Sequence, residues 1–62
     1  MTDHEIRRSI DHEIAFLRMA AIELRRVAER AAEVGDELRH MADQFEADAE
    51  ELGKRFAGLG RG

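Results

Sequence analysis

Apolar residues recur every seven positions along most of this chain. One series, the large stripe, consists of Ile10, Leu17, Leu24, Ala31, Leu38, Phe45, Leu52 and Leu59. A neighbouring series, the small stripe, consists of Ile14, Ala21, Ala28, Gly35, Ala42, Ala49 and Phe56, and a third, partial stripe contains Ile6, Ala20, Val27, Val34 and Met41. A seven-residue period is typical of helices that pack lengthwise against other helices. Since the chain also lacks Pro and is rich in Ala, Leu, Glu and Arg, the pattern predicts an all-α protein.

The dipeptide Gly35-Asp36 is the one internal position that favours a break between helices. Gly can end a helix in the left-handed conformation and Asp can cap the next helix, so the sequence predicts an antiparallel hairpin within residues 1–57. We expect helix 1 at about 3–33, capped by Thr2, a turn at about 34–36, and helix 2 at about 36–57. The heptad phase continues through Gly35, however, and one Gly costs a helix only about 1 kcal/mol relative to Ala. One long continuous coiled-coil helix is therefore the alternative.

The charge distribution favours an antiparallel arrangement. The 62 residues carry a net charge of −4, but arginines dominate residues 18–30 and acids dominate residues 36–52. Folding the chain about the bond between Val34 and Gly35 places Leu24 opposite Phe45 and Arg26 opposite Asp43. Opposite charges then face one another across the predicted hairpin.

A hairpin of this length has more apolar surface than one contact between two helices can cover. Ordering about 55 residues costs on the order of 80 kcal/mol of conformational entropy, which a single seam does not offset. The segment 14–22 is apolar on nearly all sides of its helix. We therefore expect a homodimer in the form of a four-helix bundle, or a larger protein partner. The expected interface consists of Ile10, Phe16, Leu17, Met19, Ile22, Leu24, Val27, Leu38, Met41, Phe45, Leu52 and Phe56.

Several functional classes lack support in the sequence. There is no Cys, so disulfides, thiolate metal sites and thiol nucleophiles are excluded. No uncharged stretch approaches the length of a membrane span, and the N-terminus lacks the apolar region of a secretory signal, which makes the cytoplasm the expected location. No catalytic constellation or cofactor motif is present, so we expect a non-enzymatic interaction module that acts as an assembly, adaptor or regulatory subunit.

One short pattern allows a metal-binding alternative. Glu37-x-x-His40 has the spacing found in carboxylate-bridged di-iron bundles, and Glu13 or Glu23 could supply the carboxylate of helix 1. The predicted inward face contains Leu38, which places Glu37 and His40 on its flank. We therefore expect this pair to be solvated or ion-paired, with a metal-binding carboxylate/His bundle as the alternative.

Three further features complete the sequence picture. Glu13 and Asp48 occupy positions that the heptad period would make apolar. We expect them to be partly exposed at the rim of the seam, with a role in setting helix register or oligomeric state as the alternative. Helix 1 carries six arginines, which admits a small nucleic-acid-binding dimer as another alternative, although interleaved acids and the absence of a base-stacking aromatic series disfavour it. The tail at 58–62 is rich in Gly and contains Arg61; we expect a frayed C-terminus, with a short docking peptide as the alternative.

Overall fold

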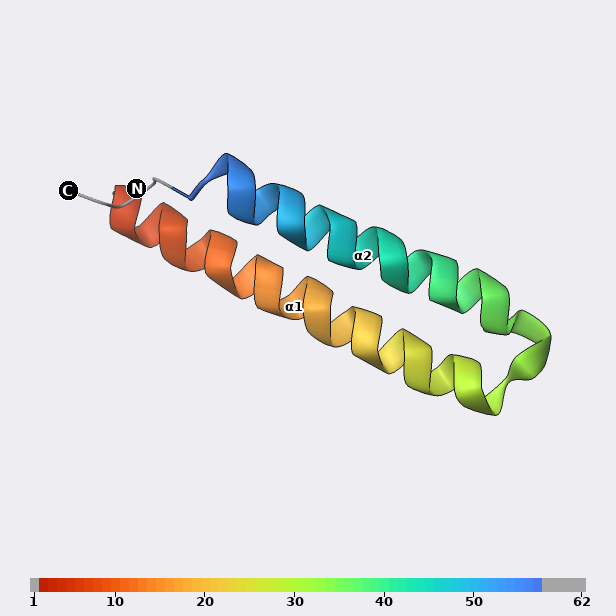
Figure 1. Ribbon diagram of the computed structural model, residues 1–62. Helices are drawn as coiled ribbons and strands as arrows, with labels where there is room; N and C mark the ends of the chain where they lie inside the picture. Colours follow the sequence, from red (N-terminus) through yellow and green to blue (C-terminus); the bar gives the residue numbers. More distant parts are fainter. Residues whose placement is uncertain (1, 58–62) are drawn as a thin grey trace.

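The chain is an all-α helical hairpin. The computed structural model describes residues 2–57, in which helix α1 (Asp3–Arg30) and helix α2 (Gly35–Arg55) lie side by side and antiparallel (Figure 1). A short 3-10 helix, η1 (Ala32–Val34), connects them. The predicted all-α hairpin is thus confirmed, and the alternative of one continuous helix is wrong. The tail that begins at residue 58, together with Leu59 of the large stripe, lies outside the described residues.

Helix α1 begins where its capping residues predict. Thr2 has extended backbone angles and its hydroxyl oxygen accepts a hydrogen bond from the backbone N–H of Glu5 at 3.2 Å. This bond satisfies one of the backbone donors that the first turn of a helix leaves unpaired. Asp3 and Glu5 also place negative charge near the positive end of the helix dipole. The cap and the two acids together fix the start of α1.

The reversal of the chain differs from the prediction in its position and conformation. Helix α1 ends at Arg30, three residues earlier than expected, and Ala31 leaves the helix with φ −120° and ψ 73°. Gly35 has φ −57° and ψ −45°, so it is the right-handed first residue of α2, and the predicted left-handed cap is wrong. Asp36 lies in the first turn of α2 and is not its N-cap, because Val34 takes that place without a side-chain hydrogen bond.

The contact between α1 and α2 is formed by the small stripe. The buried residues of the described chain are Ala21, Ala28, Gly35, Ala42 and Ala49, whereas the described members of the large stripe are only half-buried. Small side chains allow two helix backbones to approach closely. At Gly35, an added Cβ would lie 3.4 Å from the backbone carbonyl oxygen of Ala28. Close approach of the two backbones, and not a left-handed turn, is what favours a small residue at position 35.

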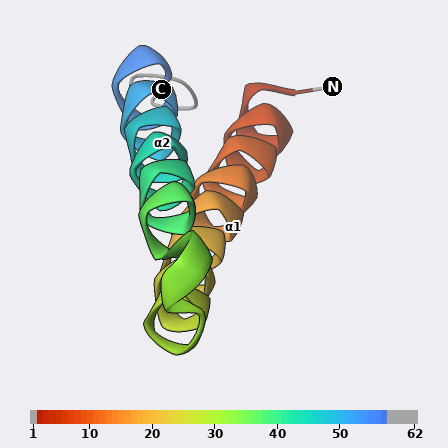
Figure 2. The same ribbon diagram turned by 90° about the vertical axis from the view of Figure 1, so that its right-hand side faces the viewer.

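The two helices diverge away from the turn. Figure 2 shows α1 and α2 close together at the turn and spread apart towards the termini. The small stripe changes at that end from Ala and Gly to the larger Ile14 and Phe56. A pocket of about 210 Å³ opens there, lined by Arg7, Ile10, Asp11, Ile14, Leu52, Gly53, Phe56 and Ala57. The helices are therefore closest where the stripe consists of Ala and Gly and furthest apart where it consists of larger residues.

Candidate interaction surface

The heptad positions divide the hairpin into two contrasting faces on either side of its seam. The buried residue Ala21 illustrates the division. Leu17 and Leu24, four residues before it and three after it, belong to the large stripe on one side of the seam. The residues three before and four after a buried seam residue lie on the other side of the same helix. This second set includes Arg18, Arg25, Arg39 and Glu46. We call the first side, with the large and third stripes from Ile6 to Leu52, the apolar face, and the other side the charged face.

The charged face is held together by Arg25, which bridges the two helices. Its guanidinium donates hydrogen bonds to Asp43, at 2.7 Å from Nη2 to Oδ1, and to Glu46. These two acceptors, Glu46 more than Asp43, raise the pKa of Arg25 above its usual value. The predicted pairing of Arg26 with Asp43 is wrong, because Arg26 pairs with Glu23 of its own helix at 3.5 Å. Simple folding about the turn places Arg25 level with Gln44, between the two acids that it binds.

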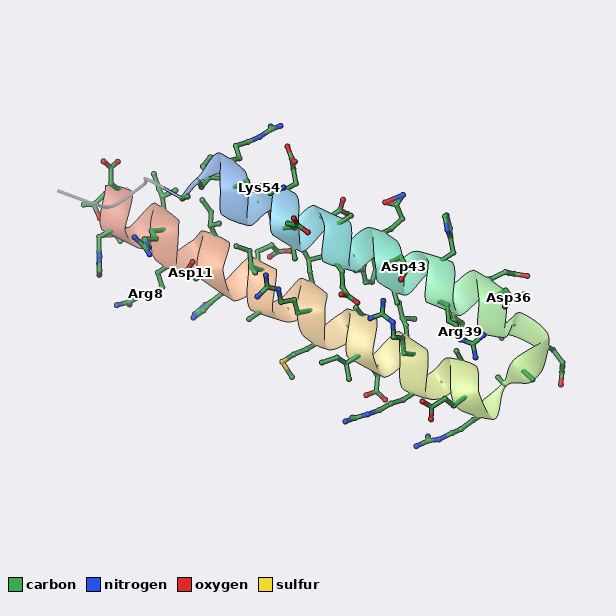
Figure 3. The ribbon with its side chains drawn as sticks, in the orientation of Figure 1. Arg8, Asp11, Asp36, Arg39, Asp43 and Lys54 are labelled. Carbon is green, nitrogen blue, oxygen red and sulfur yellow. The ribbon has the colours of Figure 1, made fainter. Side chains whose placement is uncertain are left out.

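Further ion pairs are formed within single helices. Arg39 lies 3.4 Å from Asp36 beside the turn, and Lys54 and Arg55 pair at 3.1 and 3.0 Å with the acids four residues before them (Figure 3). In α1, Arg7 lies 3.8 Å from Asp11. Acids therefore accompany many of the basic side chains, as the interleaved charges predict, and the arginines do not form a purely basic surface suited to nucleic acid.

The apolar face exposes large side chains over the length of the hairpin. Its third stripe is the most open part, with 38% of Val27, 42% of Val34 and 46% of Met41 exposed to solvent. Half-buried residues of the large stripe lie between these and the seam. Exposed apolar surface that is contiguous, and not scattered, is a feature of interaction sites.

The structure brings together most, but not all, of the residues that the sequence predicts for an interface. Eight of them share the apolar face: Ile10, Leu17, Leu24, Val27, Leu38, Met41, Phe45 and Leu52. Phe56 lies at the open end of the seam and lines the pocket. Phe16, Met19 and Ile22 are exposed by 65%, 69% and 50% and occupy heptad positions of α1 outside the large and third stripes. Val34 was missed, although its place in the third stripe could have revealed it.

Two carboxylates interrupt the apolar face. Between Ile6 and Leu52, the large and third stripes consist of apolar residues except for Glu13 on α1 and Asp48 on α2, both exposed. No basic residue occupies these two stripes within that range. Arg55, one heptad beyond Asp48, is ion-paired with Glu51 of its own helix. The face is therefore apolar with an acidic character.

The candidate metal ligands are not brought together. Glu37, His40, Glu13 and Glu23 are all exposed, and Glu23 is ion-paired with Arg26. Glu37 is two residues after the buried Gly35, and His40 is two residues before the buried Ala42. Because two residues of an α-helix correspond to a rotation of roughly 200°, both side chains project from the outer surface of α2, away from α1. Within residues 2–57, no group of three or more His, Asp or Glu side chains is arranged to hold a metal ion.

Comparisons with known proteins give no information on the role of this surface. The chain matches no protein-family model, no curated protein and no solved structure. Within the described part of the chain, neither helix has the length and apolar character needed to cross a membrane. The apolar face is accordingly the feature from which a function can be argued.

Proposed function

We propose that this chain is a non-enzymatic protein-interaction module in which two hairpins associate through their apolar faces as a four-helix bundle. Such a module would serve as an assembly, adaptor or regulatory subunit. The observation that carries the proposal is the location of the large side chains. Ala and Gly fill the seam of the hairpin, so the Leu, Phe, Val and Met side chains remain half-buried or exposed on one side.

The energetics of the isolated hairpin support this proposal. Its fully buried side chains are all alanines, which contribute little apolar area each. Apolar area removed from water contributes roughly 25 cal/mol per Å², so a cover for the apolar face would add to the stabilisation that its partly exposed large residues already give. A short chain with one small seam is poorly placed to offset the entropy of folding alone.

The dimensions of the hairpin suit a dimer. The molecule measures 48 × 15 × 13 Å, so one broad side has a plan area of about 700 Å². Two such sides in contact would bury about 1,400 Å² in total, which is within the range of specific protein interfaces. A second hairpin also offers a surface of the same length with large residues at the same spacing, which is how helical hairpins form four-helix bundles.

Sedimentation equilibrium over a wide concentration range tests the proposal. We expect reversible self-association of the wild-type hairpin, weakened at least tenfold by the double substitution Val27→Ser/Met41→Ser on the apolar face. The control is Met19→Ser/Ile22→Ser, which removes two apolar side chains that are more exposed than Val27 and Met41 but lie outside that face. A folded wild-type monomer at all concentrations, or equal effects of the two variants, would contradict the proposal.

A further inference from the structure

The two acids of the apolar face lie near the middle of its length. Gly35 and Ala28 are level with one another at the turn end, where the backbones are closest. An α-helix rises about 1.5 Å per residue, so Glu13 lies about 22 Å from Ala28 along α1. By the same measure, Asp48 lies about 20 Å from Gly35 along α2. In a hairpin 48 Å long, both carboxylates are therefore close to the centre of the face.

A second copy fits this centre poorly. Because both acids are near the midpoint, a second hairpin places its own two carboxylates opposite them whether its turn lies at the same end or at the opposite end. Four carboxylates would then share an interface that contains no basic residue from the large or third stripe between Ile6 and Leu52. Burying carboxylates without a cationic partner is costly, and like charges in an apolar environment repel strongly.

The basic side chains of the hairpin are not placed to relieve this cost. Arg18, Arg25 and Arg39 lie on the charged face, where Arg25 already binds two acids of α2. Arg55 is the nearest cation at the edge of the apolar face, and it is held by Glu51 at 3.0 Å. Since these arginines lie outside the two stripes or are already ion-paired, a covering molecule that carries positive charge is the most direct partner for Glu13 and Asp48.

We propose that the preferred occupant of the apolar face is an amphipathic helix of another protein that carries Lys or Arg beside its apolar stripe. This inference rests on the proposed function, since it uses the same face as the interaction surface. The helix lies along the hairpin as the third member of a bundle, its apolar stripe covers the large and third stripes, and its basic residues pair with Glu13 and Asp48. Self-association is the weaker use of the same face.

Designed peptides provide the test. The basic probe is a labelled peptide of three heptads with Leu at the a and d positions and Lys at the flanking e and g positions. The acidic probe has Glu in place of those Lys residues, and a scrambled basic probe keeps the composition but loses the apolar stripe. Fluorescence anisotropy should show at least tenfold tighter binding of the basic probe than of the acidic or scrambled probe at about 50 mM salt, with a smaller difference at high salt.

The double substitution Glu13→Gln/Asp48→Asn separates a local effect from the effect of net charge. It should reduce the preference for the basic over the acidic probe to within about threefold and, at the same time, strengthen self-association in sedimentation experiments. Glu29→Gln/Glu33→Gln makes the same change in net charge outside the apolar face and should preserve both the wild-type preference and the wild-type self-association. Circular dichroism is the control that each variant remains helical.

The possible failures can be told apart. Equal binding of basic and acidic probes by a self-associating wild-type hairpin would overturn the inference alone. The same holds if the Glu29/Glu33 control loses the preference as fully as the Glu13/Asp48 variant does. A folded hairpin that stays monomeric at all concentrations but prefers the basic probe would overturn the self-association of the proposed function and support the inference. One that neither self-associates nor binds any probe would overturn both.

Discussion

The substitution Gly35→Ala tests the conformation of the turn, because the sequence and the structure predict opposite signs for its effect. A left-handed Gly cap would be destabilised by Ala, since a Cβ in that conformation costs on the order of 1–2 kcal/mol. In the structure, Gly35 is right-handed and begins α2, where Ala is the better helix former by up to about 1 kcal/mol. We therefore expect Gly35→Ala to stabilise the hairpin.

The contacts of the added methyl group set the size of this gain. A Cβ at position 35 would meet Nη1 of Arg39 at 3.1 Å and the carbonyl oxygen of Ala28 at 3.4 Å. The Arg39 contact is with the end of a flexible, largely exposed side chain, which can move at the cost of its 3.4 Å contact with Asp36. The Ala28 contact is at the near limit of ordinary van der Waals distance. The net gain should be about 0.5 kcal/mol, or a rise in Tm of roughly 2–4 °C for a domain of this size.

Urea unfolding followed by circular dichroism, at several protein concentrations, measures the effect. Gly53→Ala is the matched control, because position 53 is inside α2 and its added Cβ would touch only Cδ1 of Ile14, at 4.0 Å. That variant should be stabilised whichever turn the chain adopts. A loss of 1 kcal/mol or more for Gly35→Ala, with a gain for Gly53→Ala, would refute the right-handed turn.

Three further predictions test the seam, the bridge and the apolar face. Ala42→Leu should destabilise the hairpin by about 1–3 kcal/mol in urea unfolding, because Ala42 is fully buried, whereas Leu at the exposed Ala47 should have little effect. Arg25→Met should lower Tm at low salt but not at about 0.5 M NaCl, since an exposed ion-pair network is screened, and Arg26→Met should have a smaller effect at low salt. Leu24→Asp should dissociate and unfold the assembly together, and a folded, soluble monomer of that variant in sedimentation and circular dichroism would contradict this expectation.

The helices and their antiparallel order could be predicted because they depend on local and periodic features. Thr2 as N-cap follows from hydrogen-bonding chemistry within four residues, and the heptad stripes follow from helix geometry. The turn could not be placed to the residue, because Gly and Asp favour two different local structures. At Gly35 the deciding factor is the distance between two backbones, which depends on the whole seam and not on neighbouring residues.

The candidate interface was predicted in part for a related reason. Hydrophobicity alone does not distinguish Met41, which lies on the apolar face, from Met19, which lies outside it. The distinction requires knowledge of which stripe forms the seam, and the sequence offers both a large and a small candidate. Once the small stripe is identified as the buried one, every other heptad position acquires a definite side of the hairpin.

Because the seam consists of small residues, one short chain can hold its two helices together and still expose large apolar side chains on one side. If leucines such as Leu24 pointed directly between α1 and α2, the hairpin would consume its best apolar side chains internally and leave mainly polar faces outside. With Ala21 and Ala42 in that place, the backbones are close and the leucines are displaced to one side, where they contact the neighbouring helix and remain available to another molecule. The same displacement carries Glu13 and Asp48 onto that side. Thus the residue sizes that position α1 against α2 also determine that two carboxylates lie on the face that we propose a partner covers.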